Sequence, residues 1–139
     1  LVLASESAVQ EFGLNPMARI IAHARSSRAP EEFTLAPVDD ISSLLNKTGW
    51  STDDVDLWEI NEAFAAQGLA SLRSLGVQDN DERVNPNGGA IALGHPLGMS
   101  GTRLVLTATQ ELIESNKRYA LCTMCVGVGQ GSAIIIEKI

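Results

Sequence analysis

A chain of 139 residues with 45% hydrophobic and 19% charged residues has the composition of one ordinary globular domain, long enough to bury about two thirds of the surface its unfolded form exposes. Its net charge of −7 argues against nucleic acid or an anionic membrane surface as a partner. No apolar run reaches the roughly 20 residues of a membrane span. The two cysteines lie only three residues apart and give no disulfide framework, which favours a reducing compartment. We therefore expect a cytoplasmic protein.

The N-terminal segment opens with LVLASES and no initiator methionine, so we expect the chain to be a piece of a longer protein. Leu1–Ala4 is apolar enough for a strand. Ser5 or Ser7 can cap a short helix that ends near Phe12, and Gly13 is a typical stop for it. The next apolar run, Met17–His23, predicts a buried strand with His23 in a structural or exposed position.

The middle of the chain alternates helical and strand patterns. Residues 26–36 are expected to form a loop. Three elements follow: a helix from Pro37 to about Gly49, a short strand over Val55–Ile60, and a helix over Glu62–Leu75. Asn61 can cap this second helix, whose first turn suits Glu62, and its candidate core residues are Phe64, Leu69 and Leu72.

The last third predicts one amphipathic helix and two strands. Thr102–Lys117 places Leu104, Ala108 and Leu112 on one face, with Val105 beside them. Tyr119–Val126 and Ser132–Ile136 are close enough to form an antiparallel hairpin. The whole order predicts an α/β fold: a layered, mixed five-stranded sheet, mostly parallel with one antiparallel edge, and helices on both faces.

The segment Asn85–Gly101 (NPNGGAIALGHPLGMSG) is the most unusual in the chain, because five of its residues are glycine. Glycine at this density is typical of a main chain that passes close to a ligand. Pro96 is a favoured first helical residue, which would place His95 near a helix N-terminus, where the macrodipole disfavours an imidazolium. A neutral histidine in a tight backbone cradle suits general-base catalysis, although a buried structural histidine is the alternative.

Three further residues lie where a predicted strand ends or a helix begins. Cys125 ends an apolar strand, and Gly127 can offer an unobstructed N–H to a developing oxyanion. Asn61 supplies an amide. Each also has a simpler structural explanation, as a buried small hydrophobe, a hairpin glycine and a helix cap. Cys122 is expected to pack in the core, and no second Cys or His pair completes a metal site.

These residues belong to three motifs that together resemble the C-terminal signature blocks of the thiolases, the acetyl-CoA C-acyltransferases. The blocks are NEAF (Asn61–Phe64), the glycine-rich segment Asn85–Gly101, and CVGVGQG (Cys125–Gly131). Their wording, including Val128 where many thiolases have glycine, is most similar to the 3-oxoadipyl-CoA (β-ketoadipyl-CoA) thiolases of bacterial aromatic-acid degradation. By this resemblance, residues 1–15 are the end of an N-terminal thiolase domain with a connecting helix, and residues 16–139 are the C-terminal domain.

The resemblance also implies a role for each site residue. His95 would activate a nucleophilic cysteine and hydrogen-bond the thioester oxygen, and Asn61 would hold a water that completes this oxyanion site. Cys125 would be the acid/base of the Claisen step, and Gly127 would donate to a second oxyanion hole. Ala63 and Phe64 match positions that line the pantetheine tunnel. Coenzyme A would be a substrate, with no cofactor and no metal.

One departure from the family pattern is large, because the nucleophilic cysteine and the CoA-binding loop of thiolases lie in a region that precedes this segment. We therefore expect the chain alone to be inactive and to need the N-terminal domain, within a homodimer or homotetramer. The alternative is a free-standing, non-catalytic thiolase-like module for binding or assembly. A related condensing enzyme with the same fold is disfavoured by the Cys125 loop.

Overall fold

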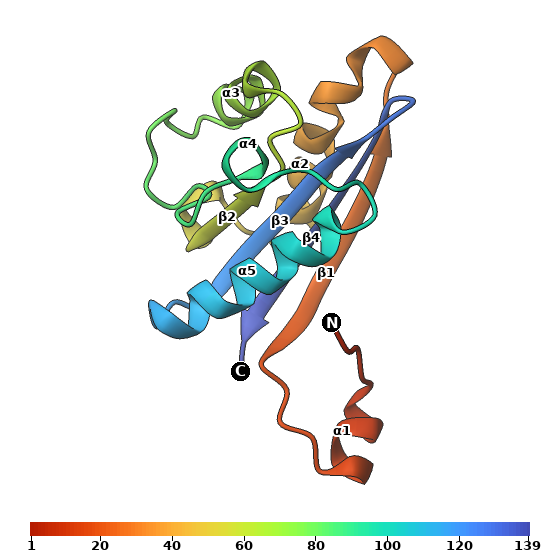
Figure 1. Cartoon of the computed structure of the whole chain (residues 1–139), viewed down its shortest axis with the longest axis vertical. Helices are drawn as coiled ribbons and strands as arrows, with labels where there is room; N and C mark the ends of the chain where they lie inside the picture. The colour runs from red at the N-terminus through yellow and green to blue at the C-terminus, as the bar shows by residue number, and fades with distance from the viewer.

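A computed structural model describes all 139 residues, and Figure 1 shows its arrangement around one twisted sheet. The sheet has four strands in the order β1-β4-β3-β2. Their bounds are β1 Ala18–Ser27, β2 Leu57–Ile60, β3 Tyr119–Val126 and β4 Gln130–Lys138. The helices are α1 Glu6–Phe12, α2 Ala36–Thr48, α3 Ala65–Ser74, α4 Ala90–Leu93 and α5 Ser100–Glu114, with short 3-10 turns at Pro30–Leu35 and Thr52–Asp54.

The prediction of five strands is wrong, and so is that of a mostly parallel sheet. Leu1–Ala4 forms no strand, because none of the four strands pairs with it and an isolated extended segment leaves its backbone groups unpaired. Pairing is antiparallel between β1 and β4 and between β4 and β3, and only β2 runs parallel to β3. The predicted hairpin of the last two strands is confirmed.

Helices cover both faces of the sheet, as predicted. On one face, Ile41 and Leu44 of α2 and Leu72 of α3 pack into a core with Trp58, Leu121 and other strand residues. On the other face, the predicted stripe of α5, namely Leu104, Ala108 and Leu112, packs on alternate residues of β2, β3 and β4. The period of four along α5 buries these three side chains together, which is why the sequence identified this helix so clearly.

The helix α1 has the caps that the sequence predicts. The Ser5 hydroxyl accepts a hydrogen bond from the Ala8 N–H at 3.2 Å, and Gly13 ends the helix in the left-handed conformation at φ 58°. Figure 1 shows that α1 projects away from the sheet, and none of its residues is buried. Residues 1–17 therefore contribute little to the core described above.

The boundaries of the two helices that follow the NEAF motif and the glycine-rich segment differ from the prediction. The helix expected over Glu62–Leu75 begins at Ala65, and neither Phe64 nor Leu69 is buried: they are 59% and 38% exposed. The helix expected to start at Pro96 begins at Ser100. A separate four-residue helix, α4, lies between these two helices, in the glycine-rich segment. None of the helices has both the length and the apolar composition required to cross a bilayer.

Candidate active site at the ends of β2 and β3

Asn61 follows the last residue of β2 and is fully buried. Its backbone N–H donates to the Thr123 carbonyl of β3 at 2.9 Å, which extends the parallel pairing by one residue. Its side chain does not cap α3, contrary to the prediction, because that helix begins four residues later. Instead the Asn61 amide nitrogen lies 3.3 Å from Nε2 of His95. The Asn61 side chain, for which local propensity favours a helix cap, therefore contacts His95, a residue distant in sequence.

His95 lies in the connection between α4 and α5 and is half-buried. Gly94 before it has φ 98° and ψ 161°, a backbone conformation that a residue with a Cβ rarely adopts. The prediction that Pro96 starts the helix is wrong, but the ring does lie at the N-terminus of α5. Its Nδ1 is 2.6 Å from the hydroxyl oxygen of Ser100, the first residue of that helix. Both ring nitrogens therefore have a partner from a different element.

The glycine-rich segment is attached to β2 by Asn85, a residue for which the sequence analysis proposed no individual role. The Asn85 side chain accepts from the Ile60 N–H at 2.8 Å and donates to the Ile60 carbonyl at 2.9 Å, so it pairs with the strand end as another strand would. The same amide group donates to Glu62 at 2.9 Å. These contacts place the start of the segment that carries His95 beside Asn61.

Glu62 has a different role from the helix-dipole contact that we expected. Its carboxylate accepts from the Ile91 N–H at 3.1 Å, at the start of α4, as well as from Asn85. A Cβ on Gly89 would lie only 2.3–2.5 Å from the Glu62 carboxylate atoms. A side chain at position 89 would therefore have to displace the Glu62 carboxylate. Periodicity alone gives no signal for such a contact, because the two residues lie far apart in the chain.

Cys125 lies two residues beyond Thr123 on β3, so it shares the end of the parallel strand pair at which Asn61 emerges. It is buried, and burial raises the pKa of its thiol. The side chain forms no direct hydrogen bond with Asn61 or His95. Gly127 lies in the exposed turn that follows, and its backbone N–H has no acceptor within the chain. The structure therefore brings Asn61 and His95 into contact and places Cys125 on the neighbouring strand.

Cys122 is a core residue, as predicted. It packs with Leu104 and Ala108 of α5 on one face of the sheet. Gly131, which pairs with Cys125, faces the opposite side of the sheet. Complete burial and the nearby Glu59 carboxylate raise the pKa of the Cys122 thiol far above its usual value. Both cysteines are free. Burial outweighs the effect of the nearby Arg103 guanidinium, so the Cys122 thiol forms little thiolate and is poorly suited to act as a nucleophile.

Ala63 and Phe64 lie on the segment between Asn61 and α3, and both are at least partly accessible. The Phe64 ring meets Phe33 edge-on, with a centroid distance of 6.5 Å. His23, the other histidine, is exposed on β1 and donates or accepts no side-chain hydrogen bond. No three His, Cys, Asp or Glu side chains are grouped so that they could hold a metal ion.

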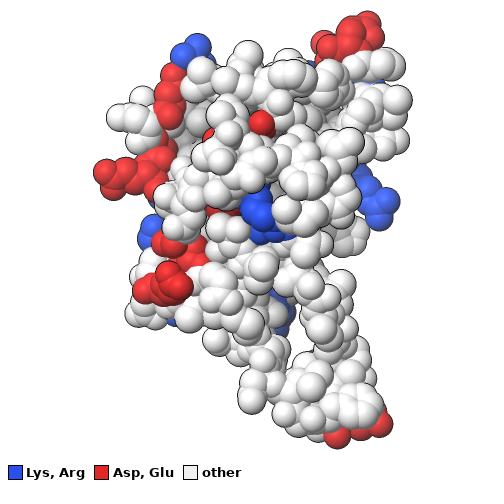
Figure 2. All heavy atoms as spheres, viewed as in Figure 1, with Lys and Arg blue, Asp and Glu red and all other residues white.

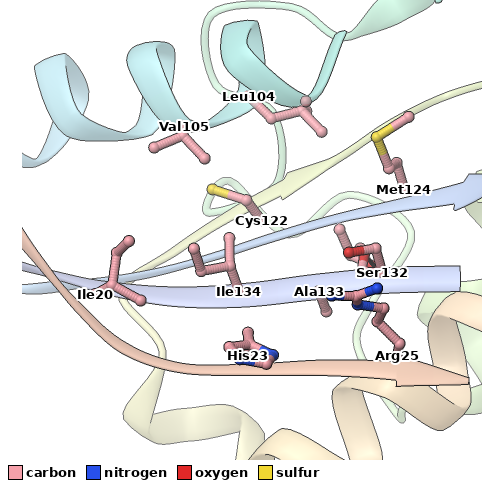
Figure 3. A pocket seen from close by; sticks show the side chains of 12 residues that line it. Ile20, His23, Arg25, Leu104, Val105, Cys122, Met124, Ser132, Ala133 and Ile134 are labelled. Carbon is pink, nitrogen blue, oxygen red and sulfur yellow. Dashed lines mark hydrogen bonds between the residues drawn. The ribbon is translucent and has the colours of Figure 1, made fainter. Parts of the chain in front are cut away.

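A hollow of about 330 Å³ lies between α5 and the β1–β4 half of the sheet. Figure 3 shows Leu104 and Val105 of α5 on one side of it and Ile20, Ile134 and Cys122 of three strands on the other. The hollow arises because α5 packs mainly over β2 and β3. The exposed Ile20, at 48%, lies at its edge. In Figure 2, acidic side chains lie mainly along the margins of the visible face, and its centre is mostly uncharged apart from one basic group.

With this geometry in place, comparison with known proteins gives a clear result. The model of the thiolase C-terminal domain matches residues 14–138, so the chain belongs to that family. Over its full length it is 56% identical to the β-ketoadipyl-CoA thiolase of Pseudomonas aeruginosa and 55% identical to the 3-oxoadipyl-CoA/3-oxo-5,6-dehydrosuberyl-CoA thiolase of Escherichia coli. It spans 35% of the length of each of these relatives.

Solved structures agree with this family. The human mitochondrial 3-ketoacyl-CoA thiolase in complex with CoA matches 98% of this chain with a TM-score of 0.93 and 46% identity, and the match covers 34% of that enzyme. An acetyl-CoA acetyltransferase of Bacillus anthracis matches 97% of the chain with a TM-score of 0.92 and 39% identity, over 34% of its own length. The chain is thus similar to about one third of each enzyme.

Proposed function

We propose that this chain is the C-terminal catalytic part of a thiolase, which transfers an acyl group between an enzyme thioester and CoA. In the cleavage direction, a 3-oxoacyl-CoA and CoA become acetyl-CoA and a shortened acyl-CoA. The observation that carries the proposal is the contact between Asn61 and His95, which joins two of the three family motifs at 3.3 Å. Both residues are held there by hydrogen bonds to other elements rather than by local propensity.

His95 is proposed to act first as a base and then as a hydrogen-bond donor. Its Nε2 takes the proton of a nucleophilic cysteine thiol supplied by the rest of the protein, and the thiolate then attacks the substrate carbonyl. The proton now on Nε2 can be donated to the thioester oxygen. Asn61 is proposed to hold a water beside it, and the buried Oδ1 of Asn61, which has no partner in the chain, provides the free hydrogen-bonding capacity.

Cys125 is proposed to be the second acid and base. Because burial raises the pKa of its thiol, the group starts protonated at neutral pH and can protonate the departing acetyl-CoA carbanion. The resulting thiolate then takes the proton of the incoming CoA thiol, which attacks the acyl-enzyme. When the acyl group leaves as acyl-CoA, the nucleophilic cysteine takes its proton back from Nε2 of His95, so the cycle returns both His95 and Cys125 to their starting states. The unpaired N–H of Gly127 is proposed to stabilise the oxyanion formed in that second attack.

The substrate class is proposed from the names of the relatives. Proteins that are 52–56% identical to this chain are named β-ketoadipyl-CoA or 3-oxoadipyl-CoA thiolases, which points to 3-oxoadipyl-CoA. The accessible side chains Ala63 and Phe64 are proposed to line the path of the pantetheine arm. The CoA-bound human and Ascaris suum thiolase structures support CoA as the common substrate.

Activity is proposed to require a partner domain, since the relatives are almost three times as long as this chain. The apolar hollow beside α5 supports this, because exposed Ile20 and half-buried Ile134 and Val105 would be covered by a packed neighbour. Residues 1–15, none of which is part of the core, are proposed to belong to that neighbour. The complete protein is proposed to be a homodimer or homotetramer.

The test is a chimera in which this chain replaces the matching third of the Pseudomonas aeruginosa enzyme. We expect CoA-dependent cleavage of 3-oxoadipyl-CoA by the chimera and none by the 139-residue chain alone. Cleavage by the chain alone would contradict the requirement for a partner. A soluble chimera that binds CoA without turnover would support the alternative, a non-catalytic binding or assembly module, and size-exclusion chromatography of the chain alone would then show a stable monomer or dimer.

A further inference from the structure

Ser100 makes the shortest contact of the His95 ring. Its Oγ lies 2.6 Å from Nδ1, and the side chain is almost completely buried, with the residue 1% exposed. The same hydroxyl donates to the Pro96 carbonyl at 3.1 Å. Ser100 is the first residue of α5, and its backbone N–H also donates to the Pro96 carbonyl at 3.0 Å, so the start of the helix and the loop that carries His95 together set its position.

The protons in this chain of contacts can be assigned one by one. A serine hydroxyl has a single proton, and the Pro96 carbonyl can only accept; when the proton goes to Pro96, the Ser100 oxygen accepts from Nδ1 of His95. Nδ1 therefore carries the hydrogen of the neutral ring. Nε2 is then the acceptor, and it faces the Asn61 amide nitrogen, which can only donate. This arrangement satisfies all three contacts.

We propose that Ser100 is a positioning residue that holds His95 as the Nδ1–H tautomer, so that the Nε2 lone pair faces the reaction. This proposal deepens the function proposed above and rests on it for its catalytic meaning. In the opposite tautomer Nε2 carries the hydrogen and cannot accept the thiol proton. A hydrogen bond from one ring nitrogen of a histidine usually determines whether the other nitrogen can accept a proton.

A purely structural hydroxyl at the C-terminal cap of α5 provides the contrast. Ser115 Oγ donates to the Glu111 carbonyl four residues earlier at 2.6 Å, as Ser100 does to Pro96, but it contacts no histidine. A serine that only satisfies a helix carbonyl would leave the ring in the tautomer it prefers in water. The two serines therefore form a matched pair for the test.

The direct measurement is ¹⁵N NMR of the full chain with labelled histidine, in which only His23 and His95 contribute signals. The variant His23→Gln assigns them. We expect the neutral His95 ring to show a protonated Nδ1 and an unprotonated Nε2, with exposed His23 as the internal reference for a free ring. A neutral His95 with its hydrogen on Nε2 would overturn the proposal.

The variants separate positioning from folding and from the proposed activity. Ser100→Ala should move the His95 signals toward those of His23, whereas Ser115→Ala should leave them in place and Ser100→Thr, which retains a hydroxyl, should restore them. In the chimera, Ser100→Ala should lower kcat by roughly 10–100-fold with little change in KM. Unchanged tautomer and kcat in Ser100→Ala would contradict the proposal. An inactive chimera with the expected tautomer would instead contradict the proposed function alone.

Discussion

The carboxylate of Glu62 occupies the space that a side chain at Gly89 would need. A Cβ at that glycine would approach the Glu62 carboxylate carbon to 2.3 Å, while the carboxylate receives hydrogen bonds from Asn85 and the Ile91 N–H. The pair connects the residue after Asn61 to the segment that carries His95. The distance between Asn61 and His95 therefore depends on the contact between Glu62 and Gly89, which involves neither residue.

Gly89→Ala should consequently disturb the site as well as the fold. The added methyl must displace the carboxylate, and we expect a loss of roughly 1–3 kcal/mol in unfolding free energy, measured by urea denaturation. Gly98→Ala in the same segment is the control, because a Cβ there meets nothing within 4 Å. Equal stability of the two variants would show that the Glu62 carboxylate moves away without cost.

The ion pair between Glu59 and Arg103 joins β2, which leads to Asn61, to α5, which begins at Ser100. Arg103 donates to Glu59 at 2.9 Å, and the Glu59 side chain is fully buried. Burial raises the pKa of Glu59 to about 7, although the guanidinium opposes the shift. Arg103→Leu should therefore cost about 3–5 kcal/mol at pH 8, because it leaves a buried carboxylate unpaired.

Denaturation of Arg103→Leu at pH 8 and at pH 5 measures this effect. The loss should be smaller at pH 5, where the folded protein holds Glu59 protonated. The double variant Glu59→Leu with Arg103→Leu should recover most of the stability, since it removes both charges. If the single and double variants were equally unstable, shape rather than charge would be responsible.

Two adjacent carboxyl groups, Asp39 and Asp40, should affect stability in opposite directions. Burial raises the pKa of Asp40 to about 6, against the smaller opposing effect of the neighbouring Ser26 hydroxyl. Between about pH 4 and pH 6 the unfolded chain releases this proton and the folded chain keeps it, so the unfolding free energy falls as the pH rises. Asp40→Asn should remove this fall. Relative to the parent chain, the variant should therefore gain about 1–2 kcal/mol of unfolding free energy between pH 4 and pH 8.

Asp39 is the matched control for that variant. Its hydrogen bonds with Arg28, at 2.6 and 2.7 Å, lower the pKa of the Asp39 carboxyl, so its contribution is present at neutral pH and is lost as the pH falls below the usual aspartate range. Asp39→Asn should weaken the protein slightly at pH 8, because the pair is partly exposed. Chemical denaturation from pH 4 to pH 8 compares the two, and parallel curves for both variants would contradict this assignment.

Local patterns were sufficient for the elements that depend on neighbours in sequence. The apolar stripe of α5 predicted its buried face, and Gly13 and Gly49 predicted the ends of α1 and α2, where both adopt the left-handed conformation. The final hairpin followed from two apolar runs separated by a glycine-rich turn. In each case the residues that determine the structure lie within a few positions of one another or on adjacent strands.

The prediction failed where a distant partner decides the conformation. Leu1–Ala4 has strand composition but no neighbouring strand, and Asn61 has cap propensity but binds His95. Ser100 and Asn85 were not identified, because a serine at a helix start and an asparagine before proline have ordinary local explanations. The motif resemblance suggested the candidate site residues as a set, but the contacts of Asn61 and His95 required coordinates.

The central claim is that His95 and Cys125 supply the proton transfers of a thiolase. The chain contains one other histidine, His23, and one other cysteine, Cys122, which serve as controls. The decisive measurement is kcat for cleavage of 3-oxoadipyl-CoA by the chimera carrying His95→Ala, His23→Ala, Cys125→Ala or Cys122→Ala. We predict that the His95 and Cys125 variants each lose at least roughly 100-fold, since general acid–base catalysis contributes about 10²–10⁴, while the other two stay within about tenfold of the parent chimera. Full activity in the His95 or Cys125 variant would contradict the account.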